Sequence, residues 1–107
     1  MLVKSPFKAN DIICFRITTG EEIVAKLKIE DVNTLTVTKP LALVNGPKGV
    51  VMVPAMVTVE AGNDIVYNKT AIISSSKPSK AVEGSYVEST SGLVMATAKD
   101  ASKLKTN

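Results

Sequence analysis

The side chains that most often carry out catalysis are sparse in this sequence. Its 107 residues include no histidine and one cysteine, Cys14. Histidine is the usual acid or base near neutral pH and the commonest metal ligand, so neither an activated nucleophile nor a metal site is indicated. The adjacent Glu21 and Glu22 would point to opposite faces of a strand and are expected to be solvated. The sequence therefore predicts a protein that binds, without a cofactor or a metal, and not an enzyme.

Alternating apolar residues predict that the chain is mainly β. On the segment 22–30, the residues expected to face one way are Ile23, Ala25, Leu27 and Ile29, and those expected to face the other way are Glu22, Val24, Lys26, Lys28 and Glu30. Comparable segments lie at 11–18, 35–43, 50–59 and 70–74, and 65–67 is short and strand-like. About five short strands joined by tight turns favour a small, strongly bent barrel.

Turn residues and changes in composition along the chain predict four parts. Residues 1–10 form a lead-in, residues 11–75 form the β domain, residues 76–97 form a C-terminal excursion, and residues 98–107 form a polar tail. A short helix is possible at 80–91, with Val82 and Tyr86 on one side. The domain is expected to be small and to bury only a modest core.

Charge and cysteine content bear on the binding partners and the cellular compartment expected for the protein. The 13 basic and 10 acidic residues give a formal charge of +3, which permits contact with phosphates but does not require it. A single cysteine cannot form an internal disulfide, so a reducing, cytoplasmic setting is expected. No segment approaches the ~20 apolar residues of a spanning helix, and no signal peptide is predicted.

The segment 50–59 differs from the other predicted strands because it is apolar on both faces. An exposed apolar strand on a small domain usually marks an interface. We therefore expect it to pair with the 70–74 edge of a neighbouring copy, a heterologous contact that can close into a ring. The interface residues would be Val51, Met52, Val53, Met56, Val57, Ala71, Ile72 and Ile73. The alternative is that residues 80–96 fold over this strand within one chain.

Residues 17–37 resemble the first signature motif of Sm-like proteins, a family that includes the Sm and Lsm proteins and bacterial Hfq. The positions that fall on the motif are Gly20, Ile23, Leu27, Asp31 and Leu35. The Gly-Glu-Glu-Ile-Val-Ala-Lys start and the Val-Pro after an apolar run look most like small Sm-like proteins of tailed phages. The resemblance covers about residues 11–75.

This resemblance implies a five-stranded open barrel whose fourth strand pairs with the neighbour's fifth, forming a homo-oligomeric ring. It also implies that single-stranded, often uridine-rich RNA binds at two loops. The matching residues here are Asp31, Asn33, Thr34, Asn68 and Lys69. The Arg-Gly of the second family motif is absent near residues 67–69, so a structural or phage-assembly ring without specific RNA binding remains the alternative. The first loop can also be explained as a simple turn.

Overall fold

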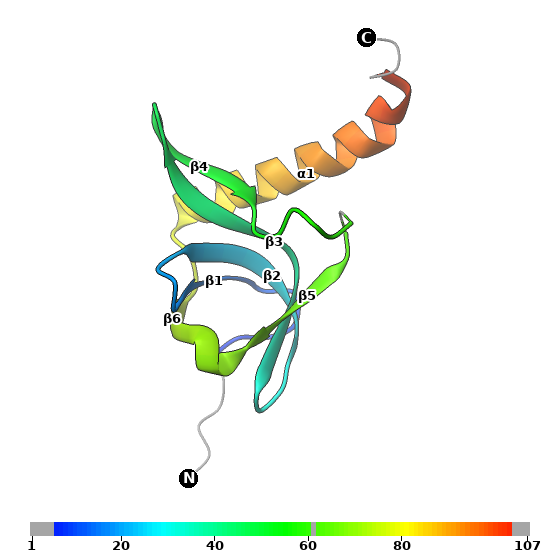
Figure 1. The fold of residues 1–107 in the computed structure, drawn as a ribbon. Coiled ribbons are helices and arrows are strands. Elements are labelled where there is room, and N and C mark those ends of the chain that lie inside the picture. The colour runs from blue at the N-terminus through cyan, green and yellow to red at the C-terminus, as the bar shows by residue number, and fades with distance from the viewer. Residues whose placement is uncertain (1–5, 61, 104–107) are drawn as a thin grey trace.

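The computed structural model describes residues 6–60 and 62–103 as one antiparallel sheet followed by a helix (Figure 1). The elements are β1 (Ile12–Ile17), β2 (Glu22–Glu30), β3 (Thr34–Gly46), β4 (Gly49–Pro54), β5 (Asp64–Asn68), the 3₁₀ turn η1 (Lys69–Ala71), β6 (Ile72–Ser76) and α1 (Lys80–Lys103). Residues 1–5 of the predicted lead-in and 104–107 of the predicted tail lie outside the described residues. The prediction of a mainly β chain is confirmed.

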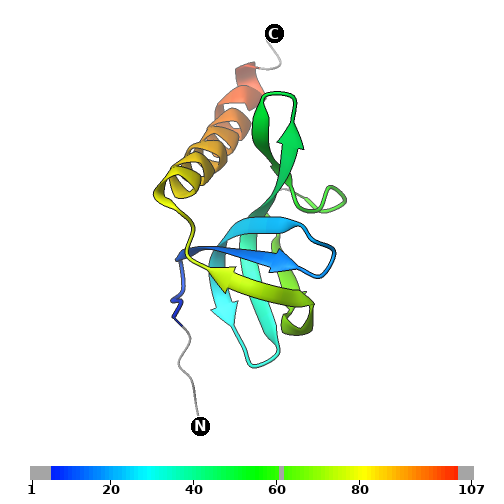
Figure 2. The same cartoon turned by 90° about the vertical axis from the view of Figure 1, so that its left-hand side faces the viewer.

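The sheet is curved but not closed. Its strand order is β4-β3-β2-β1-β6, and β5 also pairs with β3. Among the described residues, β4 and β5 pair only with β3, and β6 pairs only with β1. Figure 2 shows the strands curling around a common interior, and within the described residues no pairing of β6 with β4 or β5 closes the sheet. There are therefore six strands instead of the five expected.

Strands β4 and β5 are two halves of one edge. Both pair with the side of β3 that faces away from β2: Leu41 of β3 is opposite Pro54, and Thr38 is opposite Asp64. The chain between Pro54 and Asp64 leaves the sheet. The prediction of a continuous strand over 50–59 was wrong in its second half. The Ala55 N–H still donates to the Pro40 carbonyl oxygen at 3.0 Å, but Pro40 has no N–H with which to return the bond and extend the ladder.

The predicted fifth strand also starts later than expected. Lys69–Ala71 forms the 3₁₀ turn, so β6 begins at Ile72 rather than Thr70. Ala71, expected to be an interface strand residue, thus lies in the turn. Its carbonyl accepts a hydrogen bond from the Thr18 N–H at 2.9 Å. This contact fixes the turn against the end of β1.

A bulge in β3 reverses the alternation of its side chains. Lys26 of β2 pairs with Thr38. Two residues earlier on β2, Val24 pairs with Leu41, which lies three residues further along β3. The extra residue shifts Leu41 to the outer face of the sheet, although Leu35 faces the interior. Strict alternation over the predicted strand 35–43 would place both leucines on one face.

A second bulge, in β2, explains why Ile29 is not in the core. Leu27 pairs with Val37, and Ile29 pairs with Thr36, so β2 carries the extra residue here. Ile29 is 55% exposed, whereas Leu27 is buried. The assignment of Ile29 to the apolar face was therefore wrong, because strict alternation fails across a bulge.

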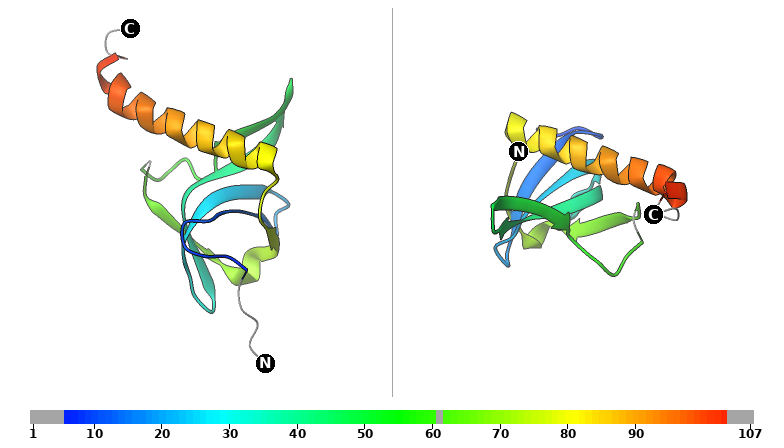
Figure 3. Two further views of the ribbon diagram at one scale, coloured as in Figure 1. Left: turned by 180° about the vertical axis from the view of Figure 1, so that it is seen from behind. Right: turned by 90° about the horizontal axis from the view of Figure 1, so that it is seen from above.

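The sheet has an apolar cluster on each face. The inner cluster contains the buried residues Ile13, Phe15, Ile23, Ala25, Leu27, Leu35, Val37 and Ala42. The outer cluster contains Val24, Leu41 and Tyr86, against which Ile12, Cys14, Leu43, Met52 and Val82 pack. Helix α1 lies across this outer face, beside the β3–β4 hairpin (Figure 3). Val24, which alternation had placed among polar residues, is buried because the helix covers it.

Tyr86 attaches the helix to the bulge in β3. Its hydroxyl group lies 2.9 Å from the carbonyl oxygen of Lys39 and 3.2 Å from that of Thr38, and it donates to these acceptors. The side chain is only 3% exposed. Burial raises the pKa of Tyr86 to about 12, while a backbone hydrogen bond from Lys26 acts in the opposite direction. The predicted C-terminal helix is confirmed, but it continues to Lys103, well past the expected end at residue 91.

Candidate functional site

The two polar loops singled out in the sequence lie together in the structure. The Lys69 backbone N–H donates to the Asn33 carbonyl oxygen at 2.9 Å. Thr34, the first residue of β3, pairs directly with Asn68, the last residue of β5. A hydrogen bond from the Asp31 N–H to the Thr34 carbonyl, at 2.8 Å, closes the first loop. All five predicted binding residues are thus neighbours, at one end of the sheet.

A cavity of about 420 Å³, which we call the loop pocket, opens beside this junction. Its lining residues are Phe7, Ala9, Leu27, Lys28, Glu30, Asp31 and Lys69. The Lys69 ammonium forms an ion pair with the Glu30 carboxylate, with Nζ and Oε2 2.8 Å apart. Two cationic and two anionic side chains therefore line the pocket, and their formal charges cancel.

Polar side chains of the two loops are available to a ligand, and of these Asp31 lines the loop pocket. Asp31, Asn33 and Asn68 are exposed, and their side chains form no hydrogen bond or ion pair within the described part of the chain. Thr34 is half-buried. An exposed amide carries both donors and an acceptor, so Asn33 and Asn68 can pair with the edge of a planar heterocycle.

Lys28 is also held by a carboxylate near this end of the sheet. Its ammonium lies 3.2 Å from the Asp64 carboxylate at the start of β5. The lysines that line the loop pocket are therefore each close to a carboxylate, one on Glu30 and one on Asp64. This arrangement lowers the attraction of the pocket for a phosphate group.

Five lining residues of the loop pocket were not predicted as site residues, among them Phe7 and Glu30. Glu30 could have been suspected because it ends the strand that leads into the first loop. The sequence did not indicate Phe7, since nothing in the local pattern of the lead-in places this residue near Lys69. Its ring is half-buried and packs against the inner cluster. An aromatic side chain at a polar pocket can stack on a ligand's flat face.

Tyr67, the aromatic residue closest in sequence to the second loop, belongs to the core instead. Its ring meets that of Phe15 edge to face, with centroids 5.0 Å apart and an interplanar angle of 74°. Burial, with a smaller contribution from Glu21, raises the pKa of the Tyr67 hydroxyl. Tyr67 is therefore not placed to stack on a base in the loop pocket.

The residues predicted for the oligomer interface occupy different environments. Val51 and Val53 lie exposed on β4, and Ile73 is 61% exposed on β6. Met56 and Val57 lie beyond the end of β4, and Val57 is 82% exposed. Met52 packs beneath helix α1 and Ile72 against the inner cluster. The alternative that the C-terminal segment covers the strand is thus realised at Met52, while the other apolar residues of β4 stay exposed.

The described residues offer little support for metal binding or for a reactive cysteine. No group of three or more histidine, cysteine or acidic side chains is placed to hold a metal ion in that part of the chain. Cys14 donates weakly to the Ser76 carbonyl, with Sγ and O 3.4 Å apart. Burial, and then the nearby Glu22 carboxylate, raises the pKa of its thiol. A thiol held protonated in this way is a poor nucleophile.

Comparison with known proteins adds no identification. No protein-family model matches the chain, and no curated protein matches it either. Within the described residues, no helix has the length and apolar character needed to cross a membrane.

Proposed function

We propose that the chain is an Sm-like subunit that assembles into a homo-oligomeric ring and binds single-stranded RNA at the loop pocket. The observation that carries this proposal is the junction of the two loops, joined by the Lys69 N–H···Asn33 hydrogen bond. The resemblance implied a site made from these two segments, which are far apart in sequence. Their contact in space supports it independently of the motif.

The sheet topology supports the assembly. The edge made by β4 and β5 and the edge made by β6 each have one strand side without a partner among the described residues. Such edges readily pair with another chain. Because the two edges differ, pairing one with the other is heterologous, and it closes into a ring at a suitable rotation. The exposed Val51, Val53 and Ile73 flank that contact.

The charges of the loop pocket indicate recognition of bases in preference to phosphates. Lys28 and Lys69 are near carboxylates, whereas Asn33 and Asn68 present free amides. Binding through bases releases few counterions, so its dependence on salt is shallow. Each site is weak by itself, and a ring that holds several of them on one strand of RNA raises the overall affinity.

Fluorescence anisotropy with labelled oligouridine and oligoadenine tests the proposal. Wild-type protein is expected to bind one of them more tightly than ~100 μM, the weak end of non-specific affinity. Changing Asn33→Ala together with Lys69→Ala is expected to weaken binding at least several-fold. Lys48→Ala, in the exposed turn between β3 and β4, serves as the control. Unchanged affinity in the double variant would mean that the loop pocket is not the RNA site.

The second candidate function is a structural ring, such as a component of phage assembly, without specific RNA binding. The ion pair between Lys69 and Glu30 favours it, because the cation that could contact RNA is already neutralised. In this case the oligomer would form normally, and neither oligonucleotide would bind at low salt. The two candidates therefore differ in RNA binding and agree in assembly.

A further inference from the structure

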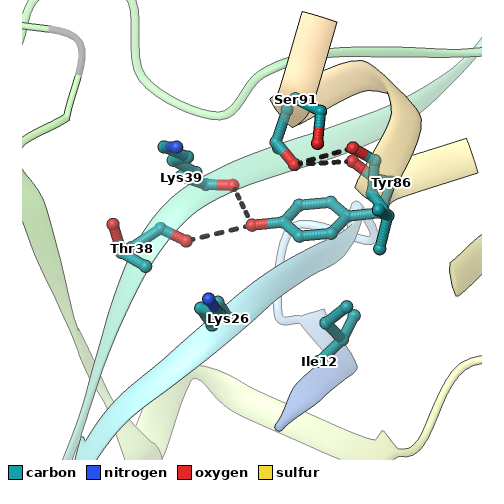
Figure 4. A pocket seen from close by; sticks show the side chains of 8 residues that line it. Ile12, Lys26, Thr38, Lys39, Tyr86 and Ser91 are labelled. Carbon is teal, nitrogen blue, oxygen red and sulfur yellow. Dashed lines mark hydrogen bonds between the residues drawn. The ribbon is translucent and has the colours of Figure 1, made fainter. Parts of the chain in front are cut away.

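A larger cavity, of about 550 Å³, lies between helix α1 and the outer face of the sheet (Figure 4). Its floor is formed by Ile12, Lys26 and Thr38, which are successive partners across β1, β2 and β3. The helix contributes Tyr86, Val87, Thr90 and Ser91. We call this cavity the helix pocket. Its volume falls in the range of roughly 300–1,000 Å³ that is typical of small-molecule sites.

The helix pocket carries positive charge without a counter-charge. Lys26 and Lys39 both line it, and in Figure 4 they flank the hydroxyl end of Tyr86. Neither lysine forms an ion pair within the described residues, and no carboxylate lines the cavity. Two ammonium groups that line one cavity repel each other, and an anion bound in that cavity would relieve this repulsion.

Lys39, the extra residue of the β3 bulge, has an unusual backbone conformation at the wall of the helix pocket. Its φ angle is +49°, in the left-handed region that residues other than glycine seldom adopt. This conformation costs about 1–2 kcal/mol for a residue with a Cβ atom. The Tyr86 hydroxyl holds it in place through the Lys39 carbonyl. Strained residues that the surrounding structure holds in place tend to occur at functional sites.

The remaining walls of the helix pocket suit a ligand that is partly apolar. Ile12, Val87 and the ring of Tyr86 give an apolar surface. The Thr90 hydroxyl donates to the Tyr86 carbonyl at 2.9 Å, which leaves its oxygen able to accept. Ser91 is exposed and forms no hydrogen bond within the described residues, so its hydroxyl can donate.

We propose that the helix pocket binds a small organic anion, one that joins a flat apolar body to a phosphate, sulfonate or carboxylate group. Lys26 and Lys39 bind the anionic group. Ile12, Val87 and the Tyr86 ring hold the apolar body. This site does not depend on the loop pocket or on ring assembly, because none of its lining residues belongs to either.

Anilinonaphthalene sulfonate, which has a flat apolar body and one sulfonate, is a suitable fluorescent probe. We expect saturable binding of one probe per chain, weakened by salt. Uncharged N-phenylnaphthylamine reports the apolar contribution alone. Inorganic phosphate is expected to compete only weakly, since it lacks the apolar body. Competition by phosphate as strong as that by phenyl phosphate would contradict the role given to the apolar walls.

The decisive variants are Lys39→Gly and Lys26→Gln. Glycine tolerates a φ of +49°, so Lys39→Gly removes the ammonium group without straining the backbone, and thermal stability should hardly change. The double variant is expected to weaken sulfonate binding roughly tenfold or more, through lost charge-assisted contacts. N-phenylnaphthylamine affinity should stay within about twofold, because it has no charge to lose.

Lys48→Gln is the matched control, since it removes a lysine outside the helix pocket. If the double variant binds the sulfonate as tightly as this control does, the pocket is not the anion site. An equal loss of both probes would also overturn the proposal, because it would trace the change to damaged packing. Oligonucleotide binding measured on the same variants should remain unchanged, which separates this site from the loop pocket.

Discussion

The loop pocket and the helix pocket are each lined by two lysines, but carboxylates lie close to the lysines of the loop pocket only. In the loop pocket, Lys69 pairs with Glu30 at 2.8 Å, and Lys28 lies 3.2 Å from Asp64. In the helix pocket, Lys26 and Lys39 have no carboxylate beside them within the described residues. The same residue type therefore leads to two expectations. A neutralised pocket suits the edge of a base, and an uncompensated one suits an anion.

The two pockets also differ in what holds them together. The loop pocket depends on backbone hydrogen bonds between two tight turns. The helix pocket depends on the docking of α1, and Tyr86 is the residue at the centre of that contact. Changes at Tyr86 should thus affect stability and the helix pocket together, and they should leave the loop pocket alone.

The largest expected effect is that of Tyr86→Ala. Removing a buried aromatic ring typically costs about 3–5 kcal/mol of unfolding free energy. The two carbonyl groups that Tyr86 satisfies would also lose their donor. Chemical denaturation measures the loss, and Val87→Ala, which truncates a half-exposed neighbour, is the control. A loss below ~0.5 kcal/mol, the usual size of a surface change, would mean that the helix is not docked as described.

A smaller effect is expected from pH. Because the pKa of Tyr86 is raised to about 12 in the folded protein, the folded state favours the neutral phenol. Its contribution to stability is complete below the ordinary tyrosine value near 10. It is lost as pH rises from there through 12. In that window the unfolding free energy of wild type should fall more steeply than that of Tyr86→Phe.

The comparison of the two proteins isolates the Tyr86 hydroxyl, since every other titratable group is the same in both. The difference in unfolding free energy across the window should be about 1–3 kcal/mol, from 1.36 kcal/mol per pKa unit. Parallel pH profiles for wild type and Tyr86→Phe would show that the hydroxyl is not buried against the bulge.

The smallest predicted effect sharpens the charge comparison. Glu30→Gln removes the carboxylate that neutralises Lys69 but keeps a side chain of similar size. If RNA binds at the loop pocket, its affinity should rise a few-fold at low salt. The slope of log affinity against log salt should steepen by up to about one unit, as for one added phosphate contact. Glu60→Gln, outside both pockets, is the control, and equal slopes would place RNA elsewhere.

Much of the sheet could be predicted from alternation, because the inner cluster is built from residues such as Ile13, Phe15 and Ile23 that keep a strict period of two. The two bulges could not be predicted from alternation. Each adds one residue to one strand. Pro40 predicts a bend or an edge near the first bulge but does not show which residue is extra, and nothing local marks Lys28 as the extra residue of the second. Their effect appears only when Leu41 turns outward and Ile29 becomes exposed.

The candidate sites show the same division. The five loop residues were identified through the family resemblance, and the structure brings them together. Glu30 and Phe7 were missed, because an ion pair between β2 and the second loop depends on tertiary packing. The helix pocket was not foreseen at all. Val82 and Tyr86 were expected on one side of a helix, but its docking on Val24 and Leu41 could not be derived from either segment alone.

The central claim, that chains assemble edge to edge into a ring, is tested most directly by the mass of the intact assembly at micromolar concentration. Light scattering or native mass spectrometry is expected to give one discrete multiple of the chain mass. Val53→Glu, on the exposed edge strand β4, should reduce it to a single chain, while Val32→Glu in the first loop should not. A wild-type protein with the mass of one chain would contradict the account.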